Sequence, residues 1–271
     1  MISHRTRYLV LLLTLVVGVT LLVSPGCARI SSPLMNDASD YTFVLLKTGP
    51  KSGTYSQEES QDIFHGHMAN MQRLADEGTL IIAGPFFGAT DQNWRGLLVF
   101  DEPDLDRATS HVSTDPGIKA GVFIAEVVPM NASPMLREAL RLEQELQAKI
   151  EAKGEASRAE GEPPQSMRKY VIVTADHDAG IDHAFLRSRG LGIIWQGEFV
   201  ARTDIATDHD VMPRPGAVFV LDAEDQEDIA AQLDGALLAK RRTKDAHLPT
   251  GPTFSVDGWY ATTSLTGLPK D

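Results

Sequence analysis

The sequence predicts an α+β protein in which the order β-α-β-β-α-β occurs twice. Two observations predict this fold class. Short β-branched and aromatic runs alternate with amphipathic helical stretches instead of gathering in one part of the chain. Residues 41–130 and 169–271 also repeat each other in outline, which indicates an internal duplication. With 271 residues, of which 42% are hydrophobic, the chain is long enough for about two domains with ordinary cores.

The first 26 residues have the layout of a secretory signal peptide. Arg5 and Arg7 form a basic start, and residues 8–23 are an almost unbroken apolar run. This run is about 16 residues long, which is shorter than the ~20 residues that span a bilayer comfortably. We therefore predict that the chain is exported from the cytoplasm and that residues 1–26 are removed.

Cys27 is the single cysteine of the chain, so no intramolecular disulfide can form. Gly26–Cys27 after an apolar run resembles the lipobox of bacterial lipoproteins, in which the cysteine is lipidated and becomes the mature N-terminus. That family prefers leucine three residues before the cysteine, where this chain has Ser24. Ordinary cleavage and an uncleaved membrane anchor are the alternatives. Each outcome places the folded part in the cell envelope, on the extracytoplasmic side of a membrane, with residues 27–40 as a tether.

The charge and the histidine spacing limit the partners that the sequence predicts. The formal net charge of -12 repels phosphate backbones, so we expect no nucleic-acid partner. Two polar clusters contain histidine and aspartate without a recognised metal-ligand spacing, so we expect no metal and no cofactor. We expect a small-molecule ligand, and a membrane partner through the lipid on Cys27. The clusters are His177, Asp178, Asp182 and His183, and Asp208, His209 and Asp210.

Residues 41–130 contain the elements of one β-α-β-β-α-β unit, the ferredoxin-like split βαβ arrangement. Gly84–Pro85 is expected to end the second strand, and Asp101 is expected to cap the second helix. Asp115–Pro116–Gly117 is expected to form a turn before the last strand. The predicted strands are residues 41–47, 80–83, 96–100 and 122–128, and the predicted helices are residues 57–77 and 101–113.

The residues in this stretch match a family. His67 stands eleven residues before the helix-ending Gly78, the strand that ends at Gly84–Pro85 follows, and Asp115–Pro116 precedes the last strand. This spacing over residues 41–130 resembles the YCII-like family. The resemblance implies a ferredoxin-like α+β unit that pairs two sheets into a dimeric α+β barrel. It also implies a small enzyme or ligand-binding protein built around a His–Asp pair, here His67 and Asp115.

The chemistry that such a pair supports is proton transfer. A histidine titrates near neutral pH, and a carboxylate beside it fixes its tautomer. We therefore predict an isomerase, lyase or dehalogenase type of reaction on a small organic acid or lactone, with His67 and Asp115 as catalytic residues. Gly84 would let a substrate approach the backbone, and Arg95 would hold an anionic group. The alternative is a non-catalytic envelope protein that binds a ligand or another protein, in which these residues serve packing, turn formation and solvation.

The second half appears in the sequence as a diverged copy. Residues 131–168 are expected to form a helix and a flexible linker, and residues 169–271 a second ferredoxin-like unit. Aligning Gly190 with Gly78 puts Ala179 where His67 stands, so we expect the copy to lack the site. Given the family resemblance, the two units would form within one chain the barrel that single-unit relatives form by dimerising. The sequence leaves the oligomeric state open.

Overall fold

The computed structural model describes residues 39–89, 91–153, 166–200, 216–242 and 254–269. Residues 1–31 form a unit separate from residues 32–271, and all described residues belong to the second unit. The predicted signal peptide and Cys27 therefore lie outside the described residues. Within the described ranges, no helix combines the length and the apolar character that a membrane crossing requires.

Most of the described residues belong to strands and helices. The strands are β1 (Ser39–Thr48), β2 (Leu80–Phe87), β3 (Trp94–Phe100), β4 (Phe123–Ala132), β5 (Met167–Asp176), β6 (Ile193–Phe199), β7 (Gly216–Leu221) and β8 (Phe254–Thr262). The α-helices are α1 (Gln57–Asp76), α2 (Leu105–Ser113), α3 (Pro116–Lys119), α4 (Glu138–Lys153), α5 (His183–Ser188) and α6 (Gln226–Arg242). Short 3-10 turns are η2 (Pro134–Arg137), η3 (His177–Ala179) and η4 (Thr263–Gly267).

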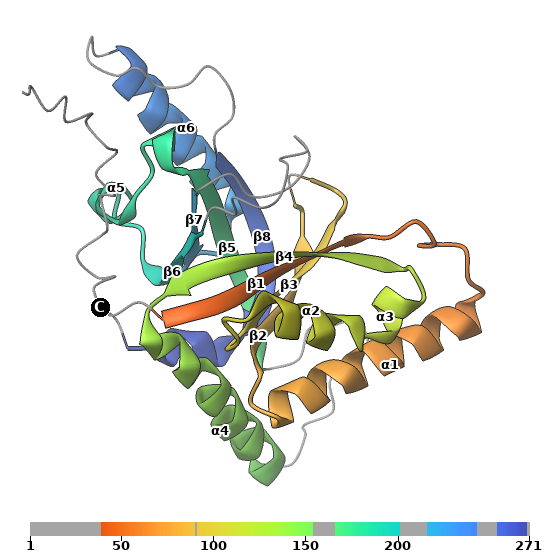
Figure 1. The fold of residues 1–271 in the computed structure, drawn as a ribbon. Coiled ribbons are helices and arrows are strands. Elements are labelled where there is room, and N and C mark those ends of the chain that lie inside the picture. The colour runs from red at the N-terminus through yellow and green to blue at the C-terminus, as the bar shows by residue number, and fades with distance from the viewer. Residues whose placement is uncertain (1–38, 90, 154–165, 201–215, 243–253, 270–271) are drawn as a thin grey trace, which may run out of the picture. The chain divides into compact units, whose positions relative to one another are not determined.

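The strands close into a barrel in the order β1-β3-β2-β8-β5-β7-β6-β4 (Figure 1). Every neighbouring pair is antiparallel. The first half supplies the sheet β4-β1-β3-β2, and the second half supplies the sheet β8-β5-β7-β6. In both sheets the fourth strand of the half pairs with its first, the first with its third, and the third with its second. The predicted fold class, with two β-α-β-β-α-β units forming an intramolecular α+β barrel, is confirmed.

The alternation of side chains along each strand divides the core into layers, because successive residues of a strand face opposite sides of the sheet. On β1, Tyr41, Phe43 and Leu45 face the barrel interior, where they pack in a cluster that includes residues of both halves. Val44 and Leu46 face outward and pack with residues of α1 and α2. The barrel interior is therefore a core shared by the two halves, and each half has an outer core of its own.

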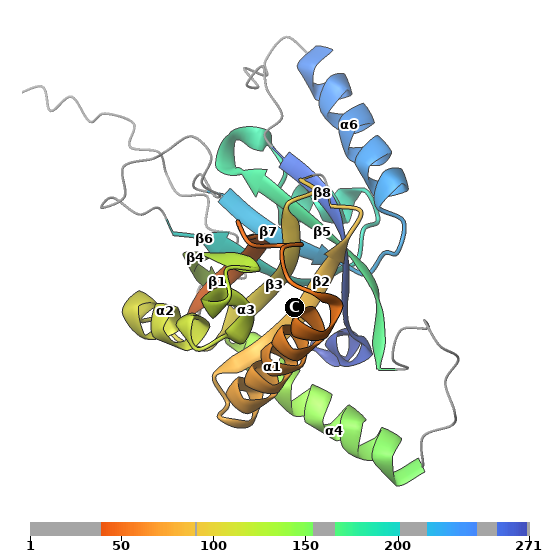
Figure 2. The same ribbon diagram turned by 90° about the vertical axis from the view of Figure 1, so that its right-hand side faces the viewer.

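The helices cover the outside of the barrel and one end of it. Figure 2 shows α1 and α2 on the side of β1, β2 and β3, and α6 beside β5 and β8. The outer core of the second half includes residues of α5, α6 and β5. Segments η2, α4 and η4 contribute Leu136, Ala139 and Leu265 to the interior cluster, and Leu268, directly after η4, joins them. One end of the barrel is therefore filled by apolar side chains from outside the sheets.

Strand β2 continues past Gly84–Pro85, where the sequence predicted its end. Phe86 and Phe87 pair with Trp259 and Gly258 of β8, which joins the two halves. Pro85 is tolerated because it stands at the margin of this seam, where β2 is paired with β3 but not yet with β8. Pairing with a strand from the other half of the chain extends β2, and no local sequence signal reports such pairing.

The second helix begins later than the sequence predicted. Asp104 is the N-cap of α2, and its side chain accepts hydrogen bonds from the backbone N–H groups of Asp106 and Arg107. Asp101, the predicted cap, instead forms an ion pair with Arg137 at 2.7 Å. A residue that precedes proline is disfavoured in the helical region, so Pro103 keeps the chain before it extended and delays the helix.

An ion pair lies inside the barrel. Lys47 of β1 and Glu126 of β4 have the inward parity of their strands, and Lys47 Nζ lies 2.7 Å from Glu126 Oε2. The other carboxylate oxygen, Glu126 Oε1, is buried without a hydrogen-bond partner. Burial raises the pKa of Glu126 above its ordinary value, and the hydrogen bond and charge of Lys47 oppose that shift. This region of the barrel interior is therefore polar.

We predict that Gly84→Ala destabilises the fold by about 3 kcal/mol or more, because a Cβ atom there would collide with the backbone carbonyl of Tyr260. Gly197→Ala should cost less, about 1 to 2 kcal/mol, since its Cβ would meet the flexible end of Met130 first. Gly235→Ala, in open space on α6, should stabilise by up to about 1 kcal/mol. Urea unfolding of the three variants measures this order, and equal losses at Gly84 and Gly197 would contradict it.

Candidate functional site

Helix α1 is fixed at its start by a capping box. The Ser56 hydroxyl accepts a hydrogen bond from the backbone N–H of Glu59, and the Glu59 carboxylate accepts from the backbone N–H and the hydroxyl of Ser56. These bonds lower the pKa of the Glu59 carboxyl, which is fully exposed. The cap sets where the helix begins, and the helical period then puts His67 and Leu74 on its buried face.

Helix α1 passes close to α3 beside His67. A Cβ atom on Gly66 would lie 3.0 Å from the side chain of Pro116, which is tighter than most packed contacts. A larger residue at position 66 would push the two helices apart. The glycine therefore lets His67, the next residue, reach the N-terminus of α3.

Asp115 is held in place by its own backbone. It is the N-cap of α3, and its Oδ1 accepts a hydrogen bond of 2.6 Å from the N–H of Gly117, with Pro116 at the first helical position. The predicted turn thus forms a short helix. Asp115 Oδ2 lies 2.5 Å from His67 Nδ1, and both residues are buried, at 4% and 6% exposure. The structure brings together the two groups expected to meet.

The contact with Asp115 defines the tautomer of a neutral His67. An ionised carboxylate only accepts hydrogen bonds, so Nδ1 carries the proton and Nε2 has a free lone pair. Nε2 forms no hydrogen bond with any other described residue, and the His67 side chain is 8% exposed. The lone pair of Nε2 is therefore not taken up by another described group and can accept a proton.

The surroundings of the imidazole are apolar. The ring of Phe123 lies 5.2 Å from that of His67, and the ring of Phe64 lies 6.2 Å from it. Phe64 and Met68 lie on α1 on either side of His67, and they are 54% and 46% exposed. Phe64 is thus an exposed apolar side chain beside the imidazole, and Met68 follows it by one helical turn on the same face of α1.

A polar network next to the dyad was not predicted from the sequence. Thr114, which precedes Asp115, donates a hydrogen bond of 2.8 Å to Asn70 Oδ1, and Arg73 donates to the same oxygen at 2.9 Å. Asn70 lies one helical turn after His67, so the network fastens α1 to the segment that carries Asp115. The helical spacing of Asn70 from His67, and the adjacency of Thr114 to Asp115, were the available signals.

The other two predicted site residues do not contact the dyad. Gly84 packs against Trp259 and Tyr260 of β8. Arg95 is exposed, and its Nε donates a hydrogen bond of 2.7 Å to Thr48 Oγ1. Their roles in substrate binding stay predictions.

No metal-binding cluster occurs among the described residues. In the first polar cluster, Asp182 caps α5 by accepting a hydrogen bond of 2.7 Å from the N–H of Phe185. His183 Nδ1 lies 2.9 Å from Gln196 Oε1 of β6. The second polar cluster, Asp208, His209 and Asp210, lies outside the described residues. The first cluster is thus built from a helix cap and a histidine–glutamine contact.

The stretch that holds the dyad matches a known family. Residues 42–131 match the family model of the YCII-related domain. This range includes both His67 and Asp115 and ends before η2. A comparison with curated proteins gave no match.

Solved structures similar to the chain include three enzymes. A chlorite dismutase variant from Candidatus Nitrospira defluvii is 12% identical over 87% of this chain and 95% of its own, with a TM-score of 0.44. The 5-chloro-2-hydroxyhydroquinone dehydrochlorinase from Burkholderia phenoliruptrix is 24% identical over 32% of this chain and 89% of its own, with a TM-score of 0.25. A siroheme decarboxylase is 8% identical over 82% and 71%, with a TM-score of 0.35. These likenesses assign no reaction to the chain.

We predict that Asp115→Asn reverses the tautomer of neutral His67. The amide oxygen will keep the cap on Gly117 N–H, which leaves the NH₂ group facing Nδ1, so the ring proton must move to Nε2. Long-range ¹H–¹⁵N NMR of the neutral ring distinguishes the two forms. Asp115→Leu should in addition destabilise by about 3 kcal/mol, since it loses both the cap and the buried bond.

Asp104→Asn is the matched control, because Asp104 caps α2 and contacts no histidine. It should leave both the His67 spectrum and the stability nearly unchanged. The same Nδ1–H tautomer in the native chain and in Asp115→Asn would show that Asp115 does not orient the ring.

Proposed function

We propose that this chain is a small-molecule enzyme in which His67 transfers a proton and Asp115 orients it. One observation carries the proposal: the buried contact between His67 Nδ1 and Asp115 Oδ2 leaves Nε2 of a neutral His67 unprotonated and without a hydrogen-bond partner among the described residues. A histidine that served packing alone would need neither a fixed tautomer nor a free lone pair. The proposed reaction class is proton abstraction next to a carbonyl, on a small organic acid or lactone.

The geometry supports each step that such a reaction requires. Nε2 takes a proton from carbon, and the electron pair of that C–H bond moves toward the carbonyl oxygen to give an enolate. The imidazolium that forms is stabilised by the buried carboxylate of Asp115. The proton then returns to another carbon in an isomerisation, or a leaving group departs in a lyase or dehalogenase reaction. General acid–base catalysis of this kind contributes about 10²- to 10⁴-fold.

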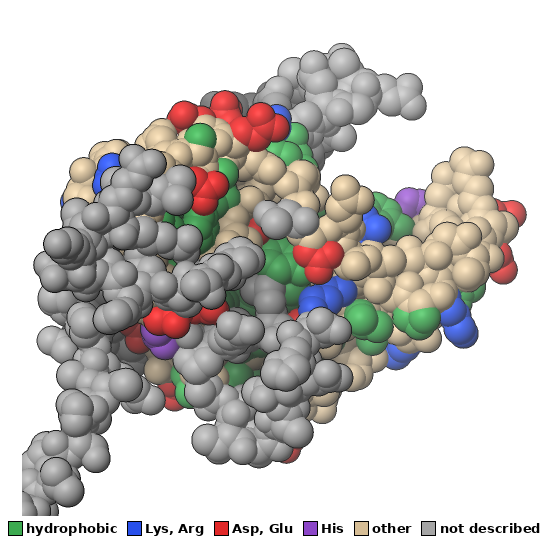
Figure 3. Space-filling view, turned by 90° about the horizontal axis from the view of Figure 1, so that it is seen from above, with side chains coloured by type: hydrophobic (Ala, Val, Ile, Leu, Met, Phe, Trp, Pro, Cys, Tyr) green, Lys and Arg blue, Asp and Glu red, His purple; other side chains and the backbone are tan. Residues whose placement is uncertain are grey.

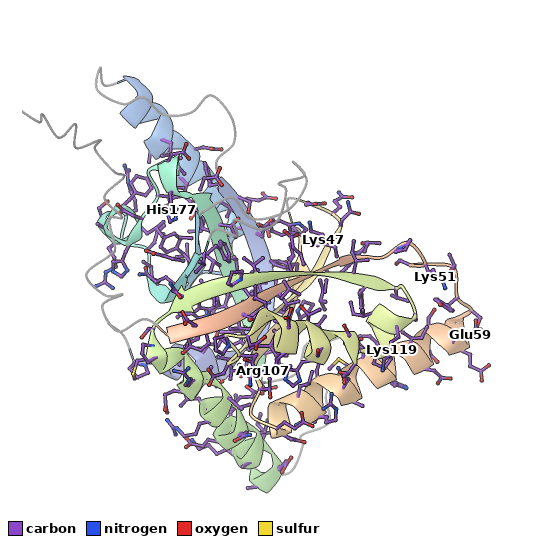
Figure 4. All side chains as sticks on the ribbon, in the orientation of Figure 1. Lys47, Lys51, Glu59, Arg107, Lys119 and His177 are labelled. Carbon is purple, nitrogen blue, oxygen red and sulfur yellow. The ribbon has the colours of Figure 1, made fainter. Side chains whose placement is uncertain are left out.

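Two lysines lie near the corner where α1 meets α3, on the elements that carry the dyad or beside them, which supports an acidic substrate. Lys119 belongs to α3, and the backbone N–H of Lys51 donates to the carbonyl of Gly121, just after α3. Figure 4 shows both lysines near the α1–α3 corner, with Glu59 on the same side. Two cations near this corner would attract a small organic acid to a chain that is otherwise strongly acidic.

A second function is favoured by the exposure of Phe64 and Met68. These side chains would suit a bound ligand or protein even without catalysis, since large exposed apolar groups next to each other mark interaction surfaces. In that case His67 would donate one hydrogen bond to the ligand or accept one from it. Catalysis and binding differ in whether a C–H bond of the ligand is broken.

Deuterium exchange separates the two functions. We predict that the chain exchanges a C–H proton next to the carbonyl of at least one 2-oxo acid or unsaturated γ-lactone in D₂O, followed by ¹H NMR. His67→Gln and Asp115→Asn should each slow the exchange by about 10²-fold or more, because both remove the base at Nε2. His65→Gln is the matched control, since His65 is an exposed neighbour on the same helix.

Exchange that is equally fast in the native chain and in His67→Gln would remove His67 from the chemistry. Saturable binding of a panel member without exchange, lost in Phe64→Ala and Met68→Ala, would support the binding function instead.

We also propose that the protein is exported and anchored in the cell envelope through a lipid on Cys27. The basic start, the short apolar run and Gly26–Cys27 support this proposal. A lipid on the mature N-terminus would hold residues 41–271 at the membrane by a tether of about a dozen residues. The dyad would then meet ligands outside the cytoplasm.

The anchor predicts a specific change in Cys27→Ala. In a bacterial host, the native chain should fractionate with membranes and carry an acylated N-terminal cysteine, detected by mass spectrometry. Cys27→Ala should lose the acyl group, and a share of it should become soluble if the leader is still cleaved. Recovery of the native chain from the cytoplasm with residues 1–26 attached would contradict both export and anchoring.

A further inference from the structure

A groove lies at the hairpin between β2 and β3, apart from the dyad. Its volume is about 360 Å³, which lies within the range of small-molecule sites. The described residues that line it are Phe86, Gly88, Ala89, Gln92, Trp94 and Arg95. Two aromatic residues, one amide and one cation therefore face a common space.

The aromatic wall of the groove is rigid. The rings of Phe86 and Trp94 lie 5.5 Å apart at 52°, and Trp94 is 8% exposed and belongs to the barrel core. Phe86 is held at the seam by its pairing with Trp259. Because Trp94 is largely buried, the partly buried Phe86 supplies most of the apolar surface of this wall, and Trp94 holds it in place behind. An aromatic side chain anchored on a strand meets a planar ring at little cost in conformational entropy.

Arg95 is the cation of this groove. Its Nε donates a hydrogen bond to Thr48 Oγ1, which directs the guanidinium, and no described acid lies within ion-pair distance of it. Five other described arginines have acidic partners, namely Arg73, Arg107, Arg137, Arg141 and Arg168, whereas Arg187 and Arg189 have none among the described residues but do not line this groove. In a chain with a net charge of -12, an arginine without an acid beside an aromatic wall is a site for an anion.

No neighbouring charge takes the place of Arg95 as the cation of the groove. Lys47 is the cross-strand partner of Trp94, but Glu126 already neutralises it at 2.7 Å. Figure 3 shows acidic, basic and apolar side chains interspersed over the described part of the face seen from above. Neither positive nor negative charge covers that part of the face. The terminal nitrogens of Arg95 therefore supply the charge that a ligand in the groove would meet. A carboxylate matches a guanidinium fork with two parallel hydrogen bonds.

The groove is separate from the dyad. Thr48, which holds Arg95, pairs across β1–β4 with Phe123, and Phe123 packs on His67. The end of β1 thus stands between the two sites. Among the described residues, none that lines the groove forms a hydrogen bond or ring contact with His67 or Asp115.

We propose that the groove binds a planar aromatic monocarboxylate, with its ring against Trp94 and Phe86 and its carboxylate on Arg95. The amide of Gln92 offers a further hydrogen bond at the rim. This site goes beyond the proposed function and does not require His67. It also gives Arg95 the anion-binding role that the sequence predicted, at a different place.

Isothermal titration calorimetry of the full-length chain in a mild detergent at low salt tests the site, with benzoate as the probe. Benzoate should bind with a saturable isotherm, and Arg95→Gln should weaken it by about tenfold or more, since a charge-assisted bidentate contact is lost. Arg95→Lys should restore part of the affinity. Benzamide, the neutral analogue of the same shape, should bind at least about tenfold more weakly than benzoate.

Two control variants make the result specific. Arg187→Gln removes an exposed arginine of α5 far along the chain from the groove, and it should leave benzoate binding unchanged. His67→Gln should also leave it unchanged, so failure of the proposed catalysis and failure of this site give different results. No saturation up to about 20 mM benzoate, equal binding of benzamide, or native affinity in Arg95→Gln would each overturn the proposal.

Discussion

The pairing of sheet edges is the constraint on which the structure depends. Each four-stranded sheet presents two edge strands with unpaired backbone groups and an inner face of large apolar side chains. Strand β2 meets β8 and β4 meets β6, so each edge of one half is closed by an edge of the other. The interior cluster mixes residues of both halves, such as Leu97 with Tyr170 and Trp259. Neither half covers its own inner face, and the barrel, rather than either half, is the folding unit that this arrangement implies.

The two halves repeat the barrel closely but differ in the layer outside it. Tyr41 donates a hydrogen bond to the carbonyl of Ser133, and Tyr170 donates to that of Thr262, across the same number of residues. Gly84 and Gly197 stand at matching places of the two seams. Outside the sheets, α1 has 20 residues whereas α5 has 6, and Ala179 lies in a short 3-10 turn. The dyad belongs to this outer layer, so the copy can lack His67 without loss of the barrel that both halves must build.

Local patterns were enough to predict the fold class, and the resemblance to the YCII-like family implied the pairing of His67 with Asp115. Other contacts between distant segments were not predicted. Alternating apolar residues mark β1, and the helical period that buries Leu74 also places His67, so each was predictable from a short window. The start of α2 at Asp104 instead of Asp101 depends on Pro103, a local signal that disfavours a helical conformation at the residue before it. The extension of β2 to Phe87 depends on β8, which lies about 170 residues later and has no signature near Phe87. The network of Asn70 and Thr114, and the position of Arg95 in a groove, likewise arise from packing between elements.

The barrel interior contains polar side chains from both halves of the chain. In the second half, Thr174 and Ser255 bond each other at 2.7 Å, and Ser255 donates to the buried Asp257 at 2.6 Å. At the place of Thr174 and Ser255, the first half has Leu45 opposite Glu126, so Glu126 depends on Lys47 alone. Burial raises its pKa above 4.5, which means that the folded state prefers the protonated carboxyl. The stability that this preference contributes is full at a pH below 4.5 and is lost as the pH rises through the folded-state value. When Glu126 is ionised, the barrel interior holds a carboxylate that burial disfavours and that Lys47, the cross-strand partner of Trp94, stabilises. A buried ion pair of this kind adds little to stability, because the cost of desolvating its two charges offsets their attraction.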